Sequence, residues 1–279
     1  MSVLLNVVDV TKSYRHQRIL DKIRLTISQH DCIAISGRPA IGKSTLLQII
    51  AGAIKPDRGH VRAHADLDAM YCAPDSLEGA MTVQRFFASS MRSSGLSRNV
   101  WQQRCNDLVN AFDLYDYLNT PLRYVSHSIG QKVSLVHAFL SMVDVLILDD
   151  PTTYLDDDTI KVLIAQIQNY LRAGGAVVLV DNNRELVEQT ATQFYRLQAH
   201  HLEEVSSFNN DHQIIARRMT FAGSMHSAAI SPNVLERVKV VKRIANEVTL
   251  EVAVIDSDYV LRNMVNSDYS LRSFVNEYK

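Results

Sequence analysis

The segment at residues 34–50, "AISGRPAIGKSTLLQII", constrains the fold of this chain more than any other. It contains the pattern G-x-x-x-x-G-K-S between the apolar run "CIAIS" and a helix-like stretch that ends at Gly52. This strand–loop–helix order is the context in which the pattern forms a phosphate-binding loop. A chance match inside a glycine-containing loop is the alternative, and the flanking elements disfavour it. The segment therefore predicts a nucleoside triphosphate site at the end of a buried strand.

The residue types in this loop suit a dense negative charge, which needs backbone N–H groups, a helix N-terminus and a cation. Gly37 and Gly42 let the backbone wrap closely, Lys43 can reach the β- and γ-phosphates, and Ser44 offers a hydroxyl to Mg²⁺. The residues expected to contact the nucleotide are Gly37, Arg38, Pro39, Ala40, Ile41, Gly42, Lys43, Ser44 and Thr45.

A second acidic motif, "VLILDD", ends at residue 150. An acidic side chain at the tip of a buried strand is costly unless a cation or donors meet it. Asp149 is therefore expected to hold Mg²⁺ through water, together with Ser44, and Asp150 is expected to polarise the attacking water. The alternative is that one of the two aspartates caps the start of a helix. This alternative is stronger for Asp150 than for Asp149, because Pro151 follows Asp150.

Strands that alternate with helices predict an α/β fold with a largely parallel sheet. "LLNVVDVTKSY" and "ILDKIRLTISQHD" are expected to be two strands joined by a turn, and "VDVLILDD" and "GGAVVLVD" to be strands covered on both faces. Residues 83–128 are helix-like and form a predicted helical subdomain. Its expected core residues are Phe86, Phe87, Trp101, Leu108, Phe112 and Leu114.

A polar stretch at residues 206–213, "SSFNNDHQ", is interpreted as a linker. Beyond it, "RVKVVKRI", "VTLEVAV", "SDYVLRNMVNS" and "YSLRSFVN" predict strand, strand, helix and strand. The expected domains are therefore residues 1–205 and a small α+β unit at residues 206–279.

Composition excludes several classes of protein. The net charge of −1 argues against nucleic-acid binding through a basic surface. No apolar run approaches the roughly 20 residues that a membrane-spanning helix requires, and the N-terminus lacks the basic start of a signal peptide. The three cysteines, Cys32, Cys72 and Cys105, are expected to be buried thiols in a reducing cytosol.

Three further segments complete a family pattern: "SHSIGQK" at residues 126–132, the run "VSLVHAFLSMVDVLILDDPTTYLD" that follows it, and "KSY" near the N-terminus. In this order they resemble the signature, magnesium strand and D-loop of the ATP-binding subunits of ABC transporters, over residues 1 to about 205. The resemblance implies that the core has a P-loop ABC ATPase fold. It also implies that Tyr14 stacks on adenine, that Ser126 and Ser128 belong to the signature, and that Asp156 is the D-loop aspartate.

The resemblance further implies the partners. In this family each MgATP site joins the glycine loop of one subunit to the signature of another, so a second ATPase subunit is expected, in a homodimer or a heterodimer. A transmembrane permease is expected as a separate chain, which would hold this subunit on the cytoplasmic face of the cell membrane. One ATPase unit followed by a short α+β tail is typical of ABC-2 exporters.

Several family positions are occupied by other residues. The general-base glutamate is replaced by Asp150, whose carboxylate is set back by one methylene, roughly 1.5 Å. The switch histidine is replaced by Asn182, which can donate a hydrogen bond but cannot carry a positive charge. The glutamine of the Q-loop is replaced by Asp75, which could still reach a metal-bound water.

The signature and the glycine loop also differ from the family pattern. The first signature glycine is Ser128, and Gly130 is displaced by two positions. Pro39 lacks an N–H, and Ala40 is sterically disfavoured if its φ is positive. The binding residues are better retained than the hydrolytic ones, so we expect the chain to bind MgATP and to hydrolyse it weakly.

Two alternative functions are considered. A regulatory subunit would use ATP to hold a dimer together while a more active partner hydrolyses it. A soluble family member in DNA repair or translation would need long coiled coils or two ATPase units, and the sequence has neither.

Overall fold

The computed structural model describes residues 2–15, 17–64, 67–74, 77, 79–92, 94–208, 214–223, 230–244, 246–253 and 256–278. The chain divides into two compact units, residues 1–209 and 210–279. The first unit extends a few residues past the expected boundary at 205, because Phe208 is buried in its core and packs against Phe194 at a ring distance of 6.5 Å.

The first unit is built around a six-stranded sheet in the order β5-β6-β7-β3-β8-β9. All neighbouring strands are parallel except β8 and β9. This confirms the expected α/β class with a mixed, largely parallel sheet. The strands are β3 (Cys32–Ser36), β5 (Ala69–Cys72), β6 (Val145–Asp149), β7 (Ala176–Val180), β8 (Gln193–Gln198) and β9 (His201–Val205).

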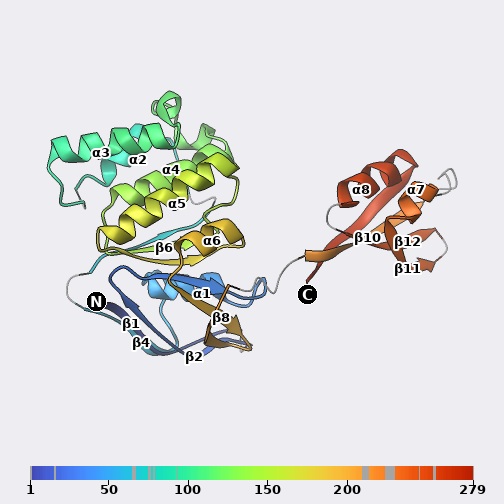
Figure 1. Ribbon diagram of the computed structural model, residues 1–279, viewed down its shortest axis with the longest axis horizontal. Coiled ribbons are helices and arrows are strands. Elements are labelled where there is room, and N and C mark those ends of the chain that lie inside the picture. Colours follow the sequence, from blue (N-terminus) through green and yellow to red (C-terminus); the bar gives the residue numbers. More distant parts are fainter. Residues whose placement is uncertain are drawn as a thin grey trace. The chain divides into compact units, whose positions relative to one another are not determined.

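Helices cover the sheet on both faces (Figure 1). Successive residues of β6 point to opposite sides: Leu146 and Leu148 join one hydrophobic core, and Val145 and Ile147 join the other. The first core contains α4 (His127–Leu140), α5 (Asp157–Arg172) and α6 (Arg184–Thr190), and the second contains α1 (Lys43–Ile50). Burial on both faces explains why β6 and β7 have continuous apolar sequences.

A separate antiparallel sheet, β2-β1-β4, packs over α1 and closes the second core. Its strands are β1 (Val3–Tyr14), β2 (Gln17–Ser28) and β4 (Arg58–Ala63). Leu5 pairs with Ile27 on one side and Ala63 on the other. The two strands expected at the N-terminus are confirmed.

The helical region consists of α2 (Val83–Ser89), α3 (Arg98–Ala111) and two 3₁₀ turns, Tyr115–Tyr117 and Leu122–Tyr124. It is therefore less continuous than the helix-like pattern over 83–128 suggested. Helix α2 begins where the Thr82 side chain accepts a hydrogen bond from the N–H of Arg85. Of the expected core residues, Phe86 is only partly buried and stacks on His137 at 4.1 Å. The others are buried: Phe87, Trp101, Leu108, Phe112 and Leu114.

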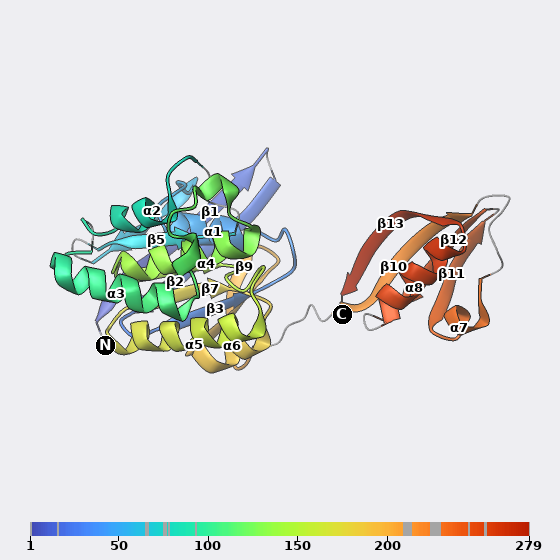
Figure 2. The same cartoon turned by 90° about the horizontal axis from the view of Figure 1, so that it is seen from above.

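In the part of it that the structure describes, the second unit is a four-stranded antiparallel sheet in the order β11-β12-β10-β13 with two helices (Figure 2). Its elements are β10 (Ile214–Gly223), α7 (Pro232–Leu235), β11 (Val238–Ile244), β12 (Glu247–Val252), α8 (Ser257–Asn266) and β13 (Tyr269–Tyr278). The β-α-β-β-α-β order with this pairing is the split βαβ arrangement. The expected strand, strand, helix and strand are confirmed; β10 and α7 were not expected.

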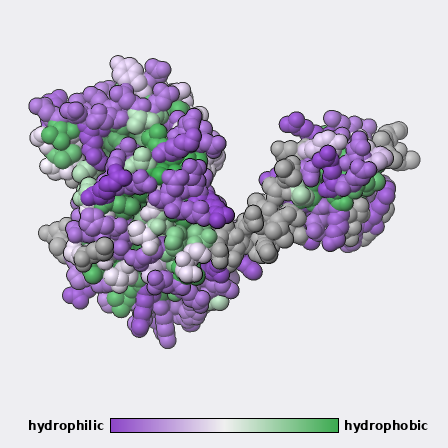
Figure 3. Space-filling view, viewed as in Figure 1, coloured by the Kyte–Doolittle hydropathy of each residue, from purple (hydrophilic) through white to green (hydrophobic). Residues whose placement is uncertain are grey.

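Among the described residues, no helix is both long enough and apolar enough to cross a bilayer. The visible surface of the first unit is mostly hydrophilic, with small apolar patches (Figure 3). The three cysteines are free and buried, as expected, and burial raises the pKa of Cys32 to about 12.

Candidate nucleotide-binding site

The glycine loop leaves the carboxyl end of β3 and enters α1, and both of its glycines are required by close contacts. A Cβ on Gly37 would lie 2.6 Å from the carbonyl oxygen of Leu197. A Cβ on Gly42 would collide with Cγ2 of Ile19, and the φ of Gly42 is 112°. Any larger residue would therefore displace the loop.

The proline and alanine of the loop lie in a turn. The N–H of Ile41 donates to the carbonyl of Arg38 at 3.2 Å, which puts Pro39 and Ala40 at the two central positions. Proline suits the first of these positions, and the φ of 60° at Ala40 is the positive value that a type II turn needs at the second. The condition for a steric cost at Ala40 is thus met, at about 1–2 kcal/mol.

Lys43 bends back over the loop. Its Nζ donates to the carbonyls of Gly37 at 2.6 Å and Arg38 at 3.1 Å, which leaves one of its three N–H donors for a ligand. Burial lowers the pKa of Lys43, and the charges of Asp150 and Asp149 oppose that shift. The lysine and both aspartates therefore share one electrostatic environment.

The two carboxylate oxygens of Asp149 differ in their hydrogen bonds. It is only 5% exposed, its Oδ2 accepts a hydrogen bond from the Tyr71 hydroxyl at 2.7 Å, and its Oδ1 has no partner among the described residues. The Tyr71 hydroxyl also meets the side chain of Gln48, one helical turn from Ser44 on the same face of α1. A buried acceptor that lacks a partner fits an outer-sphere contact to hydrated Mg²⁺.

The magnesium site would have few protein ligands. Within the described parts of the chain, no group of three or more His, Cys, Asp or Glu residues could hold a metal ion. Mg²⁺ commonly keeps several waters and takes one or two protein ligands plus substrate phosphates, so this donor set fits Mg²⁺ bound with a nucleotide.

Asp150 is held in a constrained position by its backbone. Its φ is 44°, its N–H donates to the carbonyl of Val180 at 2.8 Å, and its carbonyl accepts from the N–H of Thr153. Burial first, and then the charges of Asp149 and Asp181, raise the pKa of Asp150 to about 6, while Lys43 opposes the shift. The helix-cap alternative is wrong for both aspartates, because the cap of α5 is Asp156, which accepts from the N–H of Thr159.

The end of β7 brings the expected switch position beside this cluster. β7 lies between β6 and β3, so residues 181–183 follow a strand that borders both the aspartate strand and the glycine-loop strand. Asp181 is buried and accepts hydrogen bonds from the N–H and hydroxyl of Thr152 at 2.9 and 2.8 Å and from the N–H of Asn183 at 2.7 Å. Asn182, next to it, is exposed.

Tyr14 and Asp75 complete the residues predicted on the nucleotide side. Tyr14 ends β1, is 47% exposed, and has Lys12 Nζ 5.5 Å from its ring centre. Lys12 is anchored in turn by an ion pair with Asp57 at 3.0 Å. The ring is thus accessible for stacking. Asp75 lies outside the described residues.

The signature residues lie at a different place in the chain. Ser126 caps α4 by accepting from the N–H of Ile129 at 3.3 Å, and Ser128 is in the first turn of that helix. Among the described residues, a cavity of about 550 Å³ beside Ser126 is lined by Leu77, Gly79 and residues from 122–134 and by none from the glycine loop. The structure therefore brings together Lys43, Asp149 and Asp150. Of the signature segment, Gln131 reaches the carbonyl of Pro151, next to Asp150, at 3.0 Å.

Comparison with known proteins agrees with this geometry. The family model described as ABC transporter matches residues 20–153. The chain is 30% identical over 176 residues to the cytochrome c biogenesis ATP-binding export protein CcmA of Gluconobacter oxydans. The aligned region covers 63% of this chain and 80% of CcmA. The chain belongs to the ABC transporter family, as an ATP-binding subunit.

Two further similarities agree with the assignment. The chain is 26% identical over 190 residues to the O-antigen export system ATP-binding protein RfbB of Klebsiella pneumoniae, covering 67% of this chain and 76% of that one. A solved structure of the ATP-binding subunit of an ABC transporter has the same fold, with a TM-score of 0.67, 24% identity, and coverage of 72% of this chain and 89% of that chain.

Two residues of this ATP-binding subunit's site were not predicted from the sequence. Tyr71 binds one oxygen of Asp149, and Asp181 joins the switch segment to Thr152, two residues after Asp150. Asp181 stands directly before the switch position, so its burial at the end of an apolar strand is the signal that could have revealed it. Nothing in the pattern around Tyr71 pointed to its hydroxyl.

The first prediction concerns the metal. If Ser44 and Asp149 share one Mg²⁺, then Ser44→Ala and Asp149→Asn should not be additive in their effects on Mg²⁺-dependent nucleotide affinity. A coupling energy of about 0.5–3 kcal/mol is expected from titrations of the two single variants and the double variant. Additivity within about 0.5 kcal/mol would mean that the two side chains do not meet at one ion.

The second prediction concerns the aspartate cluster without metal. Because the folded-state pKa of Asp150 is raised, its ionised form opposes folding, fully above pH 6–7 and less as the pH falls towards the unfolded value near 3.8. Discounted for solvent screening of this half-exposed group, the effect is about 1 kcal/mol. In EDTA at pH 7.5, Asp150→Asn should raise the melting temperature by about 2–4 °C, and the gain should shrink towards pH 4. An equal or larger gain at pH 4 would contradict a raised pKa of Asp150 in the folded protein.

Proposed function

We propose that this ATP-binding subunit binds MgATP between its glycine loop and the signature of a second ATPase subunit, and that it hydrolyses the nucleotide slowly to power export by a separate transmembrane permease. The observation that supports this most is the contrast at the end of β6. Asp149 has a buried oxygen that meets no partner among the described residues and suits the metal, while the general-base position beside it holds the shorter Asp150.

Nucleotide binding is supported by the groups that converge on the loop. Lys43 supplies a cation with one remaining donor, the first turn of α1 supplies backbone N–H groups, and Ser44 and Asp149 supply oxygens for Mg²⁺. Tyr14 supplies an exposed ring for adenine. ATP and Mg²⁺ together fit this set of groups.

Slow hydrolysis is supported by the chemistry of the remaining positions. A water positioned roughly 1.5 Å further from its base is less often in a reactive geometry, which can lower the rate by orders of magnitude. Asn182 can donate a hydrogen bond to a γ-phosphate but cannot add positive charge to it. Asp75, if it substitutes for the Q-loop glutamine, would act through a metal-bound water.

A two-subunit site is supported by the position of the signature serines and by the lining of the cavity beside Ser126. Ser126 and Ser128 lie at the start of α4, and the described cavity beside them contains no residue of the loop. A second copy, or a different ATPase subunit, would supply the facing half. Export is supported by the relatives RfbB and CcmA, both named as export proteins; the ABC-2 type remains the sub-class we favour. Docking on a permease would place the subunit at the cytoplasmic face of the membrane.

The runner-up is a regulatory subunit that binds ATP with little turnover beside a more active ATPase. The same replacements, Asp150 and Asn182, favour it. Measuring ATPase activity of the subunit alone and with its co-encoded membrane chain separates the two, because a regulatory subunit stays inactive in both preparations.

The third prediction tests binding. Lys43→Ala should abolish tight MgATP binding in a calorimetric titration, because Lys43 is the cation whose position in the motif lets it reach the β- and γ-phosphates. Tyr14→Ala should weaken binding by about 1–3 kcal/mol, the usual value for base–aromatic stacking. Tripolyphosphate, which has no base, should lose affinity with Lys43→Ala and keep it with Tyr14→Ala. Unchanged MgATP affinity in Lys43→Ala would rule out this site.

The fourth prediction tests the chemistry. Asp150→Glu combined with Asn182→His should raise the ATPase rate, because glutamate restores the reach to the water and histidine restores a group that holds the γ-phosphate. Asp150→Asn should instead trap an ATP-bound dimer, visible by size-exclusion chromatography with MgATP. Restoration is expected to be incomplete, since Ser128 still alters the facing signature. No loss of rate in Asp150→Asn would place the catalytic group elsewhere.

A further inference from the structure

We propose that His200, in the turn between β8 and β9, is a positioning residue that holds the glycine loop in its nucleotide-binding shape. The inference depends on the proposed nucleotide site, because the loop is the part of that site that it concerns. His200 lies far from the loop in sequence and outside every motif recognised in the sequence. It is connected to the loop by β2, to which it hydrogen-bonds, and by β8, which it follows in the chain.

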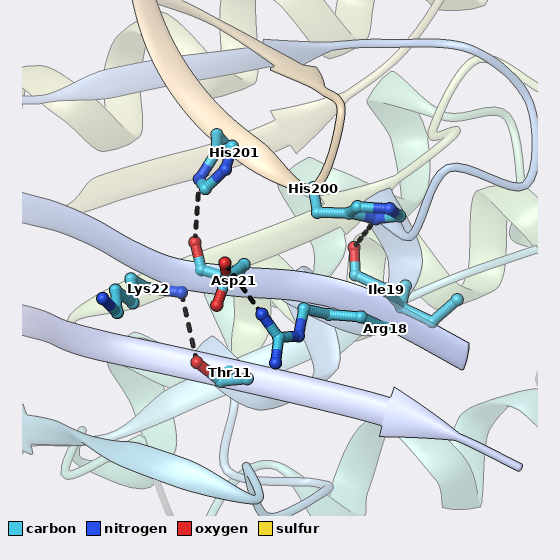
Figure 4. Close-up of polar contacts among 7 residues, drawn as sticks. All are labelled: Thr11, Arg18, Ile19, Asp21, Lys22, His200 and His201. Carbon is cyan, nitrogen blue, oxygen red and sulfur yellow. Dashed lines mark hydrogen bonds and ion pairs between the residues drawn. The ribbon is translucent and has the colours of Figure 1, made fainter. Parts of the chain in front are cut away.

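The turn bonds directly to β2. Ala199 and His200 both have positive φ, 46° and 72°, and the carbonyl of His200 accepts from the N–H of Asp21 at 2.8 Å. The His200 ring points to the carbonyl of Ile19, with Nδ1 at 3.2 Å, and His201 Nδ1 lies 3.1 Å from the carbonyl of Asp21 (Figure 4). A carbonyl oxygen only accepts, so Nδ1 carries the proton in both rings.

The segment of β2 that His200 binds rests on the glycine loop. Cγ2 of Ile19 occupies the space that a Cβ on Gly42 would need. The carbonyl of Leu197, three residues before His200 on β8, occupies the corresponding space at Gly37. The β8–β9 hairpin therefore supports both glycines of the loop, at Gly37 directly and at Gly42 through Ile19.

This support bears on binding because the loop has a strained backbone. Ala40, between the two glycines, has a positive φ that an alanine adopts only at a cost. A loop in that conformation depends on its surroundings to keep its N–H groups aimed at one point. If Ile19 is free to shift, the loop gains other conformations, and the apparent affinity falls with the fraction that remains competent.

The chain contains a matched control in another turn. His30 also has a positive φ, 68°, and its Nδ1 lies 2.7 Å from the carbonyl of Leu171. Its partner belongs to the end of α5, not to a strand that touches the glycine loop. Removing the His30 ring should cost folding stability in the same way as removing the His200 ring, without the effect on the loop.

The test uses three substitutions at His200 that separate backbone from hydrogen bond. Asparagine tolerates positive φ, and in His200→Asn the Nδ2 donor is bonded to Cγ, as Nδ1 of the histidine ring is. His200→Gly keeps the φ but removes the donor, and His200→Ala removes both. MgATP and Mg²⁺-tripolyphosphate affinities are measured calorimetrically for each full-length variant and for His30→Ala, with melting temperatures recorded in parallel.

We expect His200→Gly and His200→Ala to weaken both ligands about three- to tenfold, the effect of one lost hydrogen bond, and His200→Asn to restore the wild-type affinity. His30→Ala should lower the melting temperature and leave both affinities unchanged. Wild-type affinity in His200→Gly, or an equal loss in His30→Ala, would overturn the positioning role. A wild-type protein that binds neither ligand would instead overturn the proposed function, and this inference with it.

Discussion

The attraction between one lysine and two aspartates at the end of β6 is the interaction on which the site depends. Lys43 comes from the start of α1 and the aspartates from the strand, so the pairing requires the loop, the helix and the sheet to be in place together. Burial first, and then the charges of Asp149 and Asp181, raise the pKa of Asp150. The cluster is therefore a place of stored electrostatic energy that a divalent cation would relieve.

Much of the fold and of this cluster could be predicted because its information is local. The glycine loop lies within nine consecutive residues, and the aspartates end an apolar run that is buried on both faces. The C-terminal strands β11, β12 and β13 were recognised for the same reason, while β10 was missed because its sequence, "IIARRMTFAG", follows a polar stretch and contains two adjacent arginines.

The features of the site that could not be predicted depend on contacts between residues far apart in sequence. Tyr71 reaches Asp149 across 78 positions, Thr152 reaches Asp181 across 29, and His200 reaches Ile19 across 181. No periodicity or motif reports such pairings, because they are set by strand order: β5 beside β6, β6 beside β7, and the β8–β9 turn against β2. The helix-cap alternative for Asp150 failed likewise, because the turn after β6 delays α5 until Asp156.

We propose that this subunit binds MgATP tightly and hydrolyses it slowly. The most direct measurement is to bind radiolabelled ATP with Mg²⁺ to the purified wild-type protein, quench samples over time, and identify the bound nucleotide by chromatography. We predict retained ATP that converts to ADP at well under about 1 s⁻¹, the lower end of ordinary enzyme turnover. Conversion at or above that rate, or no retained nucleotide at all, would contradict the claim.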